Sequence, residues 1–270
     1  MDWLELTFPE LPGITRDQLV FHLSETGFGS FSEEGNDLLA FIPREKFLPD
    51  AVNRICRELK VSYRLREIPE KNWNAAWEES FEPVLVNGKC YIHAPFHRPG
   101  KGYDYDIVIE PKMSFGTAHH ETTVLMIEAM MDLDFTGKRV LDMGCGTGVL
   151  AILAEKMGAS GVLAVDSDEW AYRNTEENLE KNNSSNINVI HGGPEVVRGM
   201  FHIILANINR NVLMEMIPAF AACLYDGGIL LMSGFFEEDL AGLKDRAMEN
   251  GLRFRDARSE NKWTVTEFIR

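Results

Sequence analysis

The spacing of apolar residues in the first part of the chain predicts a small unit of helices and strands. Leu4, Leu6 and Phe8 alternate with polar residues, as expected for a strand that is buried on one face. Further along, apolar residues with either this alternation or the spacing of a helix face predict the next segments. These are a helix that Gly27 ends, strands at Phe28–Phe31 and Asp37–Ile42, a helix at Phe47–Leu59, and a strand at Tyr63–Ile68. This part of the chain is therefore expected to be an α+β domain.

The predicted order of these elements, strand–helix–strand–strand–helix–strand, is typical of a ferredoxin-like unit. We place this domain at residues 1–65 and a connecting segment at residues 66–82, which contains a short helix at Trp73–Phe81. Asn87-Gly88 lies between two short apolar runs, and this dipeptide supplies the positive φ angles of a tight hairpin turn. The remaining residues, 83–270, are expected to form a second domain.

From Arg139 onward, apolar runs of strand length alternate with helical patterns. Strands are expected at Arg139–Met143, Val162–Asp166, Ile187–His191, His202–Asn207 and Ile229–Ser233, and helices at Val149–Met157, Glu169–Lys181, Val212–Leu224 and Glu237–Asn250. Such alternation predicts an α/β fold with a doubly wound, mostly parallel sheet. Leu252–Ala257 and Trp263–Ile269 complete seven strands as an antiparallel hairpin. A mostly parallel sheet with an antiparallel last strand resembles the architecture of class I methyltransferases.

Composition and charge narrow the possible partners. The chain has 270 residues, of which 45% are hydrophobic and 26% charged, as in ordinary globular proteins. Its 27 basic and 42 acidic residues give a net charge of −15, which disfavours binding to nucleic-acid phosphates and favours a basic protein partner. The four cysteines are far apart and form no zinc motif, so we expect reduced thiols and no metal. The pattern of a signal peptide or a membrane span is missing, which predicts a cytoplasmic protein without membrane contact.

A glycine-rich turn follows the predicted strand Arg139–Met143. Its glycines are Gly144, Gly146 and Gly148, preceded by Asp142, which gives the spacing Asp-x-Gly-x-Gly-x-Gly. Glycines let the backbone approach a ligand closely, and the following helix N-terminus presents unpaired N–H groups. The dinucleotide fingerprint would need a glycine at Val149. The segment instead resembles the S-adenosylmethionine-binding motif of class I methyltransferases, with a generic nucleotide-binding turn as the alternative.

Two further strand ends carry polar residues that suit a cofactor site. Asp166 ends the next strand, where an acidic residue binds ribose hydroxyls in doubly wound folds, whereas Asp168 is placed to cap the following helix. Asn207 ends the fourth strand, at the edge where such folds bind their ligands. It is followed by Ile208-Asn209-Arg210 and not by the Pro-Pro-aromatic sequence with which amide-directed nucleic-acid methyltransferases stack a flipped base. A nucleobase substrate is therefore disfavoured, an amine substrate remains open, and the alternative for Asn207 is a structural polar strand end.

Phe115–Thr123 is the most discriminating segment of the chain. Its sequence, Phe-Gly-Thr-Ala-His-His-Glu-Thr-Thr, is similar to the Phe-Gly-Thr-Gly-x-His-x-Thr-Thr signature of the bacterial methyltransferases of large-subunit ribosomal protein L11. The resemblance extends over essentially the whole chain. Ala118 replaces the second glycine of the signature and Glu121 replaces a common proline, and both departures bear on how this loop closes over the cofactor.

The resemblance implies a cofactor, a partner and a set of site residues. The cofactor is S-adenosylmethionine, and the partner is ribosomal protein L11. The family's cofactor-binding positions carry over to Thr123, Gly144, Asp166 and Asn207, and Asp142, Gly146, Phe115 and Gly116, from the same two motifs, are expected to bind the cofactor with them. Asn207 is also expected to be the catalytic residue, because its carbonyl would orient the amine's hydrogens so that the lone pair points at the methyl group. His120, without a spaced partner, is not expected to bind metal.

The resulting hypothesis is an enzyme that methylates amino groups of ribosomal protein L11, on lysine side chains, the N-terminal amine or both. Residues 1–65 are expected to hold the protein substrate, because they contain no glycine-rich loop and no catalytic constellation. The first alternative is a methyltransferase of another protein or of a small-molecule amine. The second, from another class, is a non-catalytic ribosome-assembly module that binds the cofactor.

Overall fold

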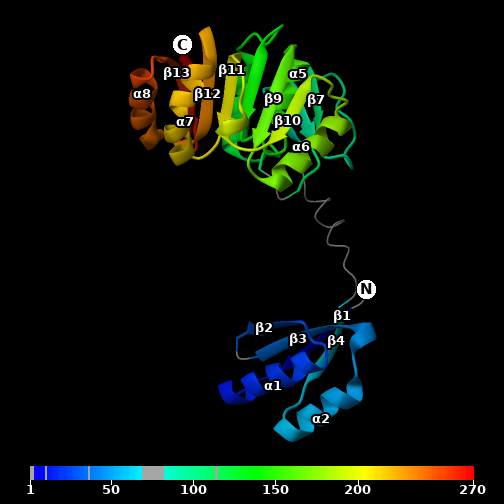
Figure 1. The fold of residues 1–270 in the computed structure, drawn as a ribbon. Helices are drawn as coiled ribbons and strands as arrows, with labels where there is room; N and C mark the ends of the chain where they lie inside the picture. The colour runs from blue at the N-terminus through cyan, green and yellow to red at the C-terminus, as the bar shows by residue number, and fades with distance from the viewer. Residues whose placement is uncertain (1–2, 10, 36, 69–81, 113–114) are drawn as a thin grey trace. The chain divides into compact units, whose positions relative to one another are not determined.

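The computed structural model describes residues 3–9, 11–35, 37–68, 82–112 and 115–270, and the chain divides into two compact units (Figure 1). The units are Met1–Ser80 and Phe81–Arg270. The described part of the first unit ends with a strand that reaches Ile68, three residues past the expected boundary at residue 65. The predicted helix at Trp73–Phe81 lies outside the described residues, so the extent of the connecting segment stays a prediction.

The first unit is a four-stranded antiparallel sheet with two helices. Its elements are β1 (Trp3–Phe8), α1 (Gly13–Glu25), β2 (Ser30–Glu34), β3 (Asp37–Pro43), the 3₁₀ turn η1 (Arg44–Lys46), α2 (Pro49–Leu59) and β4 (Arg64–Ile68). The strand order β2-β3-β1-β4 confirms the predicted ferredoxin-like arrangement. Helix α2 begins two residues later than predicted, at Pro49, because proline suits the first helical position, where no intrahelical N–H bond is needed.

The second unit begins with a three-stranded sheet, β5 (Val84–Val86), β6 (Cys90–His93) and β7 (Tyr105–Val108). β5 and β6 form the predicted hairpin, with Asn87 at φ 49° and Gly88 at φ 68° in the turn. β7 pairs parallel with β6 and was not predicted. Helix α4 (Glu121–Met131) follows, and the ring nitrogen Nδ1 of His120 accepts the backbone N–H of Thr122 at its N-terminus.

The main sheet has seven strands in the order β10-β9-β8-β11-β12-β14-β13. The strands are β8 (Arg139–Met143), β9 (Gly161–Asp166), β10 (Ile187–His191), β11 (Phe201–Asn207), β12 (Leu224–Phe236), β13 (Arg253–Glu260) and β14 (Trp263–Ile269). β8 to β12 are parallel, whereas β14 is antiparallel to both β12 and β13, as predicted for a class I methyltransferase sheet. Between the strands lie the helices α5 (Val149–Lys156), α6 (Glu169–Lys181), α7 (Arg210–Cys223) and α8 (Leu240–Glu249), and the 3₁₀ turns η2 (Pro194–Val196) and η3 (Glu237–Asp239).

Helices cover both faces of this sheet, so its central strands are apolar on both sides. On one face, Val140 and Ile203 join a core with residues of α4 and α5. On the other face, Leu141 and Ile204 join a core with residues of α7 and α8. Because neighbouring residues of one strand enter opposite cores, the carboxyl ends of β8, β9 and β11 are held rigidly at one edge. That edge is where a doubly wound fold binds its ligands.

Two further observations concern the chemistry expected from the sequence. All four cysteines are free thiols, and Cys56, Cys90 and Cys145 are buried. Within the described ranges, no helix combines the length and the apolar character needed to cross a membrane.

Candidate functional site

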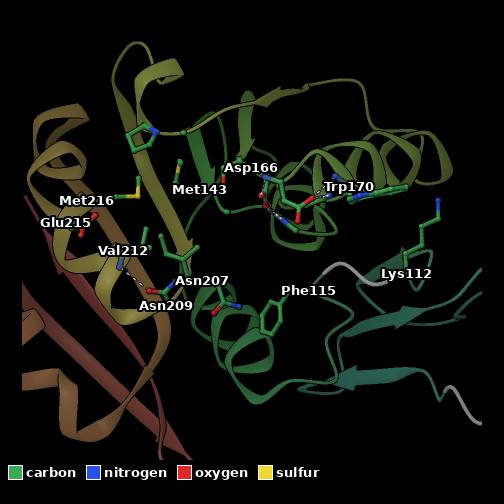
Figure 2. Close-up of a pocket in the computed structure, with 18 residues that line it drawn as sticks. Lys112, Phe115, Met143, Asp166, Trp170, Asn207, Asn209, Val212, Glu215 and Met216 are labelled. Carbon is green, nitrogen blue, oxygen red and sulfur yellow. Dashed lines mark hydrogen bonds between the residues drawn. The ribbon is translucent and has the colours of Figure 1, made fainter. Parts of the chain in front are cut away.

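A cavity of about 1140 Å³ lies at the carboxyl edge of the parallel strands (Figure 2). Five of the residues expected from the sequence line it: Phe115, Gly144, Gly146, Asp166 and Asn207. Asp168, which was expected to act as a helix cap, also lines the cavity. The other lining residues were not expected from the sequence: Lys112, Met143, Ser167, Trp170, Ala171, Gly193, Pro194, Ile208, Asn209, Val212, Glu215 and Met216. The strand ends and the glycine turn thus meet around one space, as predicted.

The glycine turn connects β8 to α5 in a conformation that suits glycine. Gly144, Gly146 and Gly148 have φ angles of 75°, 58° and 79°. A Cβ on Gly146 would lie 2.2 Å from the carbonyl oxygen of Phe115, and one on Gly144 would lie 2.2 Å from Cγ2 of Ile208. The turn is therefore packed against two other segments that line the cavity, and side chains at these positions would displace them.

Asp166, at the end of β9, presents its carboxylate to the cavity. Oδ2 accepts the backbone N–H of Gly146 at 2.9 Å, and Oδ1 accepts that of Asp168 at 2.9 Å. Each oxygen keeps a further lone pair, so the carboxylate is held in place and is still able to accept hydroxyl hydrogens. The Asp168 side chain caps α6 by accepting the N–H of Trp170 at 2.7 Å, which confirms its predicted capping role.

Asn207, at the end of β11, is held by α4. Its Nδ2 donates to Oγ1 of Thr123 at 3.4 Å, and Thr123 itself is fully buried. Oδ1 of Asn207 is buried and has no hydrogen-bond partner among the described residues. An unpaired buried acceptor costs about 1–3 kcal/mol, so this amide favours a ligand that donates a hydrogen bond. Thr123 does not line the cavity, and its observed contact is with Asn207.

Asp142 and Gly116 also lie outside the cavity lining. Asp142 is 1% exposed; Oδ2 accepts the N–H of Ala151 at 3.1 Å, and Oδ1 has no partner among the described residues. The pKa of this carboxyl is raised to about 7, mainly by burial; the hydrogen bond from Ala151 opposes this shift, and the nearby charge of Asp166 adds to it. The observed contact of Asp142 is with the start of α5, whereas its role toward a cofactor stays a prediction.

The loop before α4 is attached to the glycine turn. The carbonyl oxygen of Phe115 accepts the N–H of Thr147 at 2.9 Å, and that of Gly116 accepts the Thr147 hydroxyl at 2.7 Å. Gly116 has φ 108°, and Ala118, which replaces a glycine of the family signature, has φ 65°. The backbone thus keeps a left-handed conformation at Ala118, and the Phe115 ring, 50% exposed, remains at the cavity.

Comparison with known proteins identifies the family. The model of the family "Ribosomal protein L11 methyltransferase" matches residues 24–270. The chain belongs to this family. It is 38% identical to the ribosomal protein L11 methyltransferase of Bacteroides fragilis over 279 residues, covering 100% of both chains. It is 41% identical to that of Porphyromonas gingivalis over 260 residues, covering 93% of this chain and 90% of the relative.

A solved structure agrees with this family. The ribosomal protein L11 methylase of Lactobacillus delbrueckii subsp. bulgaricus superposes with a TM-score of 0.66 at 25% identity, covering 70% of this chain and 99% of that one. The protein is therefore a class I methyltransferase, its cofactor is S-adenosylmethionine, and the predicted enzyme class is confirmed. The site fits this cofactor, because the left-handed glycine turn and the carboxylate of Asp166 face one cavity together with Asn207, whose amide oxygen has no partner among the described residues.

Sequence reasoning missed the wall of the cavity that α7 and η2 form. Val212, Glu215 and Met216 are three and four residues apart and therefore share one face of α7. The one sequence signal for this wall is Asn209, whose side chain caps α7 by accepting the N–H of Val212 at 3.2 Å. Among the residues that the structure describes, no group of three or more His, Cys, Asp or Glu side chains is arranged to hold a metal ion.

Proposed function

We propose that this methyltransferase transfers methyl groups from S-adenosylmethionine to amino groups of ribosomal protein L11, on lysine side chains, the N-terminal amine or both. The relatives named above are methyltransferases of this ribosomal protein, and they match this chain over its full length or nearly so. The net charge of −15 suits an enzyme that binds a basic protein substrate and does not itself recognise nucleic acid. A cytoplasmic location and the absence of a membrane partner belong to the same proposal.

The observation that carries an amine substrate is the unpaired Oδ1 of Asn207. The cofactor supplies an already activated methyl group, so the protein mainly has to position a neutral amine in line with it. An amine that donates a hydrogen bond to Oδ1 is oriented by this contact. The bond from Nδ2 to Thr123 keeps the amide oxygen available to the substrate. A lysine amine, with a reference pKa of about 10.4, must bind in its neutral form, which apolar side chains around the site, such as Met143 and Ile208, favour.

The cofactor-binding roles are proposed as follows. Asp166 accepts the ribose hydroxyls, and the turn at Gly144 and Gly146 lets the backbone approach the cofactor. Phe115 forms part of the wall, and the neighbouring Gly116 anchors that wall to Thr147. Thr123 and Asp142 support the site from behind the lining, through Asn207 and the first turn of α5 respectively.

The direct test is transfer of labelled methyl groups into purified ribosomal protein L11, followed by peptide mass spectrometry. The proposal predicts labelled amines on this protein, and loss of the label with Asn207→Ala. Label that enters a small-molecule amine or another ribosomal protein but not L11 would favour the alternative substrates. Cofactor binding by calorimetry without any transfer would favour a non-catalytic module.

The first unit is proposed to hold the protein substrate. It forms a complete sheet with its own core, and the cavity described above is lined entirely by residues of the second unit. A fragment Phe81–Arg270, checked for folding by circular dichroism, should bind S-adenosylmethionine like the full chain. It should lose most methylation of the ribosomal protein but not of a free amine, because tethering raises the local concentration of the substrate. Equal rates of fragment and full chain on the ribosomal protein would refute this role.

A further inference from the structure

The cavity extends in two directions from Asp166. On one side it is lined by the α7 face that carries Val212, Glu215 and Met216, and on the other side by Trp170 and Lys112 (Figure 2). Pro194 belongs to the first side, because it also lines a small neighbouring pocket together with Met216. We call the first side the α7 arm and the second the α6 arm. The cofactor's purine and its methionine part leave the ribose at opposite ends. The purine therefore lies in one of the two arms, and the methionine part with its methyl group lies outside that arm.

The α7 arm suits a purine better than the α6 arm does. Its wall is mainly apolar, with Pro194, Val212 and Met216, as a flat aromatic ring requires. The 6-amino group of adenine donates hydrogen bonds and needs an acceptor. The α6 arm contains Lys112, which is itself a donor and is paired with Glu177. The α7 arm contains the carboxylate of Glu215.

Glu215 is the cavity carboxylate that remains unengaged. Asp166 accepts two backbone N–H groups, and Asp168 caps α6. Within the described part of the chain, no hydrogen bond or ion pair engages the carboxylate of Glu215, although this side chain lines the cavity beside Met216. Glu215 is an exposed residue of α7, so its carboxylate beside this apolar wall is able to accept a hydrogen bond from an amino group at the far end of a ring.

We propose that Glu215 accepts a hydrogen bond from the 6-amino group of the cofactor's adenine and thereby selects adenine among purines. This inference rests on the proposed placement of the ribose at Asp166. Glu215 is then a specificity residue for the cofactor and takes no part in methyl transfer. The substrate amine, by contrast, reaches the methyl group from the side of Asn207.

The test is a double-mutant cycle by calorimetry on the full chain. The ligands are S-adenosylhomocysteine and its analogue with hydrogen in place of the 6-amino group, and the proteins are wild type, Glu215→Ala and Glu215→Gln. A hydrogen bond to a charged group changes affinity roughly 10- to 100-fold, so wild type should prefer the amino ligand by about that factor. Glu215→Ala should bind both ligands with similar affinity. Glu215→Gln should keep a preference of several-fold, because its amide oxygen still accepts.

Glu180→Gln, an exposed residue of α6 outside the cavity lining, is the matched control and should behave like wild type. The inference is overturned if wild type does not distinguish the two ligands, or if Glu215→Ala keeps the full preference. It is also overturned if Glu215→Ala leaves both affinities unchanged but raises KM for the protein substrate, since Glu215 would then face the acceptor amine. These binding measurements need no methyl transfer, so their outcome does not depend on which substrate is methylated. The labelled-methyl assay tests the proposed substrate separately. A failure of the ribose placement appears as unchanged S-adenosylhomocysteine affinity in Asp166→Ala.

Discussion

Replacing Asp142 with asparagine should make the protein more stable at neutral and alkaline pH. The carboxyl is 1% exposed, one of its oxygens lacks a partner among the described residues, and its pKa is raised to about 7 by burial. An unfolded chain has the ordinary value of 3.8 for this group. Between these values the folded protein binds more protons than the unfolded chain, so stability falls as pH rises. The group's stabilising contribution is complete below pH 3.8 and is lost as pH rises through about 7.

The size of the effect follows from the two pKa values. A difference of about 3 units at ~1.4 kcal/mol each corresponds to ~4 kcal/mol over the whole range. Of this, ~2 kcal/mol falls between pH 5.5 and pH 8, the range in which the protein is readily handled. Asparagine has no charge to bury and keeps an amide oxygen for the N–H of Ala151. The free energy of unfolding of Asp142→Asn should therefore rise relative to wild type by ~2 kcal/mol between pH 5.5 and pH 8 and level off above it.

Urea unfolding of the cofactor-free proteins at several pH values measures this difference. Asp134→Asn is the control: Asp134 is exposed and its pKa is lowered by the backbone N–H of Thr136, so it stays charged in both states above pH 5.5. The stability difference between this control and wild type should not depend on pH in that range. A constant difference between Asp142→Asn and wild type would refute the reasoning, because it would mean that folded Asp142 is already ionised at pH 5.5.

Three further predictions concern the site. Asp166→Ala should weaken S-adenosylmethionine binding by roughly 10- to 150-fold in calorimetry, because a charged acceptor of the ribose is lost, whereas Asp168→Ala should mainly destabilise α6. Asn207→Ala should lower kcat by roughly 10-fold or more with a smaller change in cofactor affinity, and wild-type kcat at saturating substrate would contradict its role. Gly146→Ala should abolish measurable cofactor binding, because its Cβ would lie 2.2 Å from the carbonyl oxygen of Phe115; a variant that binds normally would show that the turn adapts.

The sequence by itself determined the order of elements in the first unit and from Arg139 onward, the class of the sheet and the cofactor turn. These are local properties: strands buried on both faces are continuously apolar, and only glycine adopts positive φ without strain at Gly144, Gly146 and Gly148. Helix α4 was not predicted because its apolar residues surround the helix, with Leu125, Met126 and Ile127 all buried, so the helical period is weak. β7 was missed because a single residue, Ile107, is buried in its four positions.

Only the tertiary structure decided which polar groups are satisfied and which are left unpaired. The pairing of Asn207 with Thr123, far apart in the sequence, depends on how α4 packs beside β11. The burial of Asp142 and the wall that Glu215 forms on α7 depend likewise on neighbours from distant segments. A residue's type and spacing specify what it is able to bind. Its burial and its partners, which set its pKa and its availability, arise only when separate elements pack together.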